Sequence, residues 1–239
     1  MIRRLFACPE CDNLLTRTQA VLGWCWLPMH FFVVPLLVSM AAFYAPVELD
    51  GAELSFICYA VYFAFTLIVM WPWLRRNFDV LVENPGRCAL CLLMALAIDY
   101  EVTLLVQIVL LLLEKSIQNP NNTQVAEYAS YNYGAMKAAA VYLAPVAEET
   151  LFRGVVFGTI RRKNRAAAYA VSMLLFGFYH VWQYAVVYAD PWQLVYMAQY
   201  LPAAFVLCWQ YERSGSIWTP IAFHMLLNAL SFFVLSYTY

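Results

Sequence analysis

Long apolar stretches, separated by short polar segments, run from about residue 19 to the end of the chain. A helix needs about 20 mostly apolar residues to cross the roughly 30 Å hydrocarbon core of a bilayer. The pattern therefore predicts an all-α, polytopic transmembrane helix bundle in which residues 1–239 form a single membrane-embedded domain. About seven spans are expected: Gln19–Ala45, Leu54–Leu74, Cys88–Leu113, Ala135–Ile160, Ala166–Ala189, Trp192–Tyr211 and Ser216–Tyr237.

The composition supports a membrane protein. Hydrophobic residues make up 64% of the chain and charged residues 12%, whereas soluble domains average about 45–50% and about 25%. This excludes a disordered, collagenous or coiled-coil chain and argues against a water-soluble enzyme. The net charge of −1 gives no basic surface for nucleic acid, so no nucleic-acid partner is expected and the lipid bilayer is the expected environment.

Basic residues lie mainly between alternate predicted spans. With the N-terminus inside, the cytoplasmic segments hold 11 of the 14 Lys and Arg residues; Lys115 and Lys137 face outward and Arg153 lies within a span. The loop Pro46–Glu53, which has three acidic residues and no basic one, also falls outside. The positive-inside rule therefore predicts an N-in, C-out protein. We expect it in a bacterial cell membrane.

Ionisable residues inside the predicted spans are the first candidates for a functional site, because each costs about 2.5–3.5 kcal/mol at a helix centre. The fourth span contains Glu148, Glu149 and Arg153. Glu149 and Arg153 are four residues apart, so they share a helix face and can pair, while Glu148 points toward a different neighbour. Two adjacent carboxylates cannot both ionise cheaply in low dielectric, which suits one of them to act as a general base. A structural ion-pair cluster is the alternative interpretation.

Two further pairs have helical spacing. His180 follows Phe176 by four residues, and Asn228 follows His224 by four. At about 1.5 Å per residue, Glu148, His180, His224 and Asn228 lie roughly 12–21 Å from the cytoplasmic ends of their spans. They can therefore share one polar cavity among the fourth, fifth and seventh spans. A histidine satisfied within the core is the alternative for each ring.

Other ionisable residues fit less well. Asp99 and Glu101 in the third span are two residues apart, about 200° round a helix, and cannot share a face. A structural role is expected for both, and Asp99 or Glu101 could pair with Arg153. His30 lies in the first span with no evident partner, and we expect it to be non-catalytic.

Cysteine pairs give a weaker signal. Cys8 and Cys11 have the spacing of half a zinc ribbon, and a full structural site needs four ligands. The other such pair, Cys88 and Cys91, falls at the start of a predicted span. The sequence leaves the role of the first pair open.

Three motifs follow one another on separate apolar segments: Glu-Glu-x-x-x-Arg at Glu148–Arg153, Phe-x-x-x-His at Phe176–His180 and His-x-x-x-Asn at His224–Asn228. This arrangement resembles the CPBP family, also called the Abi family, which contains type II CAAX prenyl proteases and bacteriocin-processing or self-immunity proteins. The surrounding stretches APVAEETLFRG and YERSGSIWTPIAFHMLLN are also similar to the family's. The resemblance covers residues 135–239.

The resemblance implies an intramembrane endopeptidase that uses glutamate and histidine. Glu148 and His180 would activate the attacking water, His224 and Asn228 would hold the oxyanion, and Glu149 with Arg153 would orient the first group. Phe176 would support the site. The implied substrate is a membrane-associated peptide or protein, such as a prenylated CAAX-type tail or a bacteriocin-like precursor. Positioned bases and fixed polar donors in a dry cavity are what amide hydrolysis needs.

Metal chemistry is a separate question. The chain lacks His-Glu-x-x-His, the helical zinc signature. Glu148, His180 and His224 could still form a zinc site of the His/Glu type. The resemblance favours metal-free water activation, with no cofactor assigned.

Two other functions would explain buried carboxylates and histidines. A transporter or proton relay needs such groups, although no inverted repeat or matching pair of broken helices is visible. A non-catalytic immunity or scaffold protein of the same family would keep the fold alone. Every motif position is filled here, which favours an enzyme.

Overall fold

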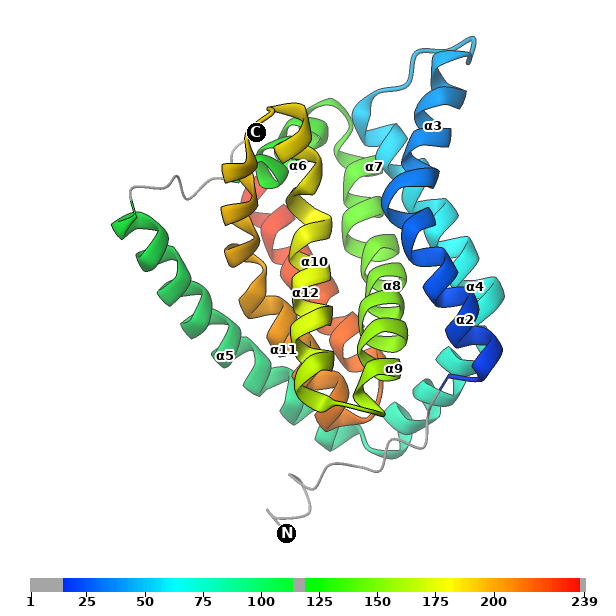
Figure 1. Cartoon of the computed structure of the whole chain (residues 1–239), viewed down its shortest axis with the longest axis vertical. Coiled ribbons are helices and arrows are strands. Elements are labelled where there is room, and N and C mark those ends of the chain that lie inside the picture. Colours follow the sequence, from blue (N-terminus) through cyan, green and yellow to red (C-terminus); the bar gives the residue numbers. More distant parts are fainter. Residues whose placement is uncertain (1–14, 114–118, 237–239) are drawn as a thin grey trace.

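The computed structural model describes residues 15–113 and 119–236, and within these ranges the regular structure is helical (Figure 1). Cys8, Cys11 and Lys115 lie outside the described residues. Five helices are long and apolar enough to cross a membrane: Arg17–Phe43, α4 (Gly51–Glu83), α5 (Pro85–Leu112), α10 (Arg165–Val187) and α12 (Trp218–Leu235). The predicted all-α membrane fold is confirmed, and the chain is an integral membrane protein.

The predicted fourth span is a continuous rod made of shorter helical pieces. Its pieces are α7 (Tyr133–Lys137), η2 (Ala138–Leu143), α8 (Ala144–Glu149), η3 (Thr150–Phe157) and α9 (Gly158–Arg161), of which η2 and η3 are π-helical. The predicted sixth span differs more. It consists of a 3₁₀ segment, η4 (Pro191–Gln199), followed by the 14-residue α11 (Leu201–Ser214). The expected number of about seven spans is therefore approximate.

The first long helix has a π-helical turn that is followed closely by a proline. It consists of α2 (Arg17–Pro28), η1 (Met29–Val33) and α3 (Val34–Phe43), and the Val34 N–H donates to the Met29 carbonyl, five residues back. In the same π-helical register, the His30 carbonyl would accept from the N–H of residue 35. Residue 35 is a proline and has no N–H. The Tyr62 hydroxyl from α4 donates to the His30 carbonyl instead, at 2.9 Å. The break in the backbone ladder thus ties the first helix to α4.

Polar residues in the connections start the helices. Asp50 and Glu53 form a capping box before α4, in which the Asp50 carboxylate accepts from the Glu53 N–H at 2.8 Å. Asn164 caps α10, where its side-chain oxygen accepts from the Ala167 N–H. Such caps satisfy N–H groups that a helix start leaves unpaired.

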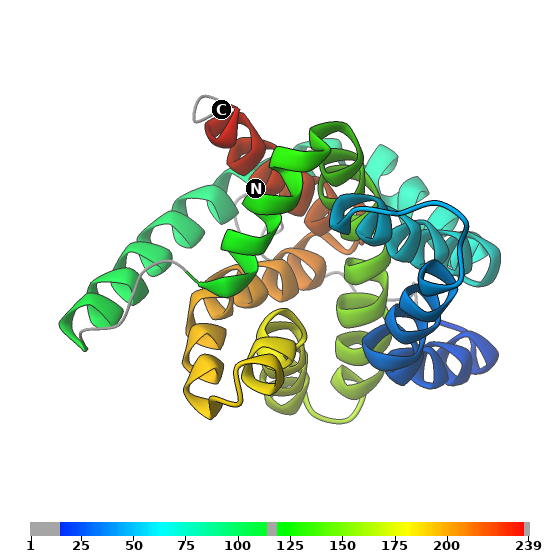
Figure 2. The ribbon, with the colours of Figure 1, turned by 90° about the horizontal axis from the view of Figure 1, so that it is seen from above.

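The rod α7–α9 forms the middle of the bundle. It packs against α4, α10 and α12, while the first helix covers η3 (Figure 1). Gly154 in the rod permits a very close approach by α4, since a Cβ at this position would lie 2.6 Å from the buried ring of Trp73. Viewed from above, α5 diverges from the bundle, and α6 (Pro120–Tyr131) lies across one end of it (Figure 2).

The described basic residues other than Lys137 and Arg153 gather at the opposite end of the bundle from α6. There the ends of α4 and α9 meet the starts of α2 and α10 (Figure 1). Arg161 and Arg165 pair with the buried carboxylate of Glu212 at 2.8 and 2.7 Å, and the Tyr169 hydroxyl donates to the same carboxylate. This grouping agrees with the positive-inside pattern, and the N-in orientation stays a prediction.

Hydrogen bonds to α4 also hold the turn between α11 and α12 in place. Gly215 adopts a left-handed conformation (φ 76°) that ends α11. The Ser216 hydroxyl then donates to the Asn77 carbonyl, and the Ile217 N–H donates to the Asn77 side-chain oxygen. Because α12 carries His224 and Asn228, this anchor helps to set the position of both side chains.

Candidate active site

Glu149 lies at the centre of a fully buried polar cluster. Its Oε1 accepts a hydrogen bond from Arg153 at 3.0 Å and lies 2.8 Å from Nδ1 of His224 in α12. The guanidinium of Arg153 stands over the ring of Phe176, 4.2 Å from its centroid. The predicted pairing within the rod is confirmed. The resemblance implies that Glu149 and Arg153 orient Glu148 and His180, and in the structure Glu149 also contacts His224.

Glu148, one residue earlier, faces another way and has different partners. Its Oε1 accepts a hydrogen bond at 2.9 Å from the hydroxyl of Tyr59 in α4. Its Oε2 is buried, has no hydrogen-bond partner and lies 3.9 Å from Nε2 of His180 in α10. The two adjacent carboxylates of the rod therefore contact different residues: Glu149 contacts Arg153 and His224, and Glu148 contacts Tyr59 and faces His180.

The hydrogen bonding of His180 defines its tautomer. Nδ1 lies 2.8 Å from the Phe176 carbonyl oxygen, which can only accept, so Nδ1 carries the proton. In the neutral ring, Nε2 then presents a lone pair toward the free Oε2 of Glu148. Two acceptors 3.9 Å apart cannot hydrogen-bond to each other. A water molecule that donates one proton to each would satisfy both.

Asn228 completes the rod's own hydrogen bonding. At the end of η2 the Ala144 N–H donates to the Ala139 carbonyl, five residues back. The next residue, Pro145, has no N–H for the Ala140 carbonyl. The Nδ2 of Asn228 donates to that carbonyl at 2.7 Å. One amide hydrogen of Asn228 is thus committed to the rod, and the second remains available.

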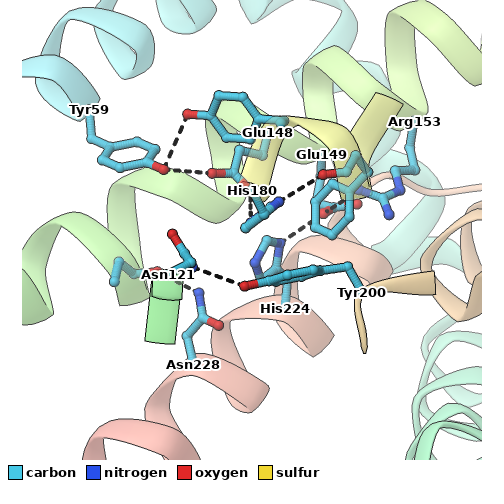
Figure 3. Close-up of polar contacts among 12 residues, drawn as sticks. Tyr59, Asn121, Glu148, Glu149, Arg153, His180, Tyr200, His224 and Asn228 are labelled. Atoms are coloured by element: carbon cyan, nitrogen blue, oxygen red, sulfur yellow. Dashed lines mark hydrogen bonds and ion pairs between the residues drawn. The ribbon is translucent and has the colours of Figure 1, made fainter. Parts of the chain in front are cut away.

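One cavity of about 580 Å³ joins these groups. Glu148, His180, His224 and Asn228 all line it, as predicted, and Figure 3 shows their side chains converging from the rod, α10 and α12. Tyrosine rings, the side-chain amides of α6 and apolar side chains line the remainder, and none of the described lining residues is Lys or Arg. The buried Glu149 lies behind this lining. The cavity is polar at its base and aromatic toward α6.

Sequence reasoning missed two tyrosines at the site. Tyr59 contacts Glu148, and the ring of Tyr200 stacks on His180 at 4.4 Å between centroids. The Tyr200 hydroxyl also accepts a hydrogen bond from Asn121 of α6, which links the cavity mouth to the histidine (Figure 3). With 17 tyrosines in the chain, neither spacing nor hydropathy distinguishes these two.

The remaining candidates lie apart from this constellation. Asp99 is half-buried with no partner for its Oδ1, and Glu101 is exposed. The considered pairing with Arg153 is not found, because Arg153 pairs with Glu149 and lies far from solvent. The buried ring of His30 stacks on Tyr62 at 3.8 Å, outside the cavity lining.

Among residues 15–113 and 119–236, no three His, Cys, Asp or Glu side chains come together as a set that could hold a metal ion. Cys88 and Cys91 are buried free thiols.

These features define a polytopic membrane protein with a buried glutamate–histidine site. Residues 132–230 match the family described as type II CAAX prenyl endopeptidase Rce1-like. The protein named "Putative membrane peptidase YdiL", from Bacillus subtilis (strain 168), is 31% identical over 87 residues, which are 36% of this chain and 31% of that protein. No solved structure matches the chain.

The resemblance drawn from the three motifs is therefore confirmed over the segment that carries them. The Bacillus relative is consistent with a bacterial origin. The chain aligns with about a third of the length of that curated relative.

Proposed function

We propose that the protein is an intramembrane endopeptidase that hydrolyses a peptide bond in a membrane-associated peptide or protein. One observation carries this proposal: the unpartnered Oε2 of Glu148 and the Nε2 lone pair of His180 face each other across 3.9 Å at the base of the cavity. Two bases so placed suit the activation of a water molecule. The family matches support the same reaction class.

In the proposed reaction, the water is held by Glu148 and His180, and Oε2 of Glu148 takes one proton from it as the water oxygen attacks the scissile carbonyl carbon. A tetrahedral oxyanion forms. The same proton then passes to the leaving nitrogen, the C–N bond breaks, and a carboxylic acid and an amine are released. Holding water and carbonyl side by side in a cavity supplies part of the rate enhancement through orientation.

His224 and Asn228 are the proposed oxyanion donors. The Nδ1 proton of His224 is committed to Glu149, so His224 donates from Nε2 only when both ring nitrogens are protonated. Asn228 offers its second amide hydrogen, since the first is bound by the Ala140 carbonyl. Donors fixed before the reaction stabilise charge that develops during it.

We propose that the water is activated without a metal. The described residues contain no set of three ligands in suitable positions. The check is activity after exhaustive dialysis against a chelator, followed by addition of zinc. We expect unchanged turnover. Loss of activity on dialysis with recovery on adding zinc would contradict this part of the proposal.

The test of the function uses purified protein in detergent with fluorogenic peptides, both plain and prenylated. Wild type is compared with Glu148→Gln, and with Glu101→Gln as a matched control for an exposed carboxylate within a span. We expect cleavage by wild type and the control, and loss in Glu148→Gln at equal thermal stability. Equal cleavage by all three would overturn the proposal.

A further inference from the structure

The cavity includes a hydrogen-bond donor from outside the family-matched segment. Tyr59 lies in α4, whereas the match covers residues 132–230. Its hydroxyl donates to Oε1 of Glu148 at 2.9 Å and lies 3.3 Å from the hydroxyl of Tyr179 in α10. The N-terminal half of the chain thus reaches the group proposed as the base.

The direction of these hydrogen bonds follows from counting protons. A tyrosine hydroxyl has one hydrogen, and an ionised carboxylate can only accept. With the hydrogen of Tyr59 directed at Glu148, the contact between the two hydroxyls requires Tyr179 to donate. The result is a directed chain from Tyr179 through Tyr59 to Glu148. Tyr179 directly precedes His180 in α10. The hydrogen-bond chain therefore links the helix that carries His180 to the side chain of Glu148.

The chain fixes which oxygen of Glu148 is used. Oε1 is occupied by Tyr59, whereas Oε2 is unpartnered and faces Nε2 of His180. Without the hydroxyl, the carboxylate could rotate and present either oxygen, or turn away from the histidine. Tyr59 itself is held in place, because its ring packs edge-on against Tyr62, 5.5 Å away.

We propose that Tyr59 is a positioning residue for Glu148, which it holds with Oε2 directed at the water shared with His180. This inference rests on the proposed function and adds to the motif residues one from the N-terminal half. Tyr59 acts through Glu148, and Tyr179 acts through Tyr59. The expected signature is a loss in turnover with little change in KM, since Tyr59 would act on the orientation of the base rather than on the binding of substrate.

The test compares Tyr59→Phe, Tyr179→Phe and Tyr62→Phe in the full-length protein, using the best cleaved peptide. Tyr62 is the matched control: it lies one turn away in α4 and its hydroxyl binds the His30 carbonyl rather than the carboxylate. We expect kcat to fall about 10–100-fold in Tyr59→Phe, the range of a hydrogen bond to a charged group. Tyr179→Phe should lose about 2–10-fold, as for a neutral hydrogen bond. Neither change should move KM more than about threefold.

The outcomes separate this inference from the proposed function. If Tyr59→Phe keeps the kcat of Tyr62→Phe while Glu148→Gln is inactive, the positioning role is wrong and the peptidase stands. If Glu148→Gln cleaves like wild type, the peptidase mechanism itself is wrong. Tyr59→Phe and Tyr62→Phe could also lower kcat and the thermal midpoint by the same amounts. That outcome would make the loss a general effect on stability and would also overturn the positioning role. If Tyr59→Phe does not fold, Tyr179→Phe decides, because Tyr179 acts through Tyr59. An unchanged kcat in Tyr179→Phe would then overturn the positioning role of Tyr59.

Discussion

The Nδ1 of His224 in α12 lies 2.8 Å from Oε1 of Glu149 in the rod, and that same oxygen accepts from Arg153. A single buried carboxylate therefore orients a histidine of the cavity and neutralises a guanidinium that has no exposure to solvent. Orientation of the site and stability of the bundle depend on one side chain.

Glu149→Gln should separate these two roles. Loss of the carboxylate leaves Arg153 buried without its counter-charge, which we expect to lower the free energy of unfolding by about 3–5 kcal/mol. Activity should fall about 10–100-fold as His224 loses a charge-assisted hydrogen bond. Thermal unfolding in detergent and kcat/KM measure the two effects.

The control is the double variant Glu149→Gln with Arg153→Met, which removes both charges. It should regain much of the stability, because the uncompensated charge is gone, and remain impaired in catalysis. Recovery of activity together with stability would show that Glu149 matters only for folding.

Asn228 and Pro145 should be thermodynamically coupled through the Ala140 carbonyl. Asn228→Ala removes the amide donor to that carbonyl and should cost about 1–3 kcal/mol. In a Pro145→Ala background residue 145 regains an N–H that can serve the carbonyl, so the same substitution should cost less. Thermal unfolding of the four proteins measures the coupling. Equal costs in both backgrounds would mean that the carbonyl is not the link.

Gly154→Ala should destabilise the contact between the rod and α4. A methyl group at this position would lie 2.6 Å from the Trp73 ring, which is fully buried and cannot move freely. Overpacking of this kind costs about 1–3 kcal/mol. Gly86→Ala is the control, since a Cβ there meets no atom within 4 Å. A thermal midpoint that falls equally in both variants would disprove the close packing.

Stability should depend on pH through Glu212. Burial alone would raise the pKa of Glu212, but hydrogen bonds from Arg165 and Tyr169 and the charge of Arg161 outweigh it and lower that pKa below its usual value. A lowered pKa stabilises the fold above the unfolded value, about 4.3, and this contribution is lost as pH falls through the folded value.

We therefore expect wild type to exceed Glu212→Gln in thermal midpoint at pH 7, and the gap to narrow below about pH 4. The difference at pH 7 should correspond to about 1.5–3 kcal/mol, as for hydrogen bonds to a charged group. Midpoints measured from pH 3 to pH 8 give the curve. A gap that stays constant across this range would argue against the ion-pair cluster.

Hydropathy predicted the membrane fold and most of the long helices, because apolar length is a direct requirement of the bilayer. The predicted span Gln19–Ala45 corresponds closely to the observed helix Arg17–Phe43. The span Trp192–Tyr211 was wrong as a single helix. Apolar composition does not distinguish a 3₁₀ segment from an α-helix. Pro191 begins the 3₁₀ segment there, and Pro202 is the second residue of α11.

Helical spacing predicted contacts within one helix and failed between helices. The pairing of Glu149 with Arg153 followed from their four-residue separation. The contact of Glu149 with His224 and that of Glu148 with Tyr59 did not, because periodicity shows which residues share a face and not which neighbour that face meets. The link between Asn228 and Ala140 also needed the structure, since it depends on a π-helical register.

The most direct test of the account is a double-mutant cycle on Glu148 and His180. Glu148→Gln, His180→Ala and the double variant are compared with wild type in kcat/KM on one cleaved peptide. Groups that act as a unit on one water are strongly non-additive, so each single variant should lose about 10³–10⁴-fold and the double variant scarcely more. Losses that multiply in the double variant, or activity retained in either single variant, would contradict joint activation of a water by these two residues.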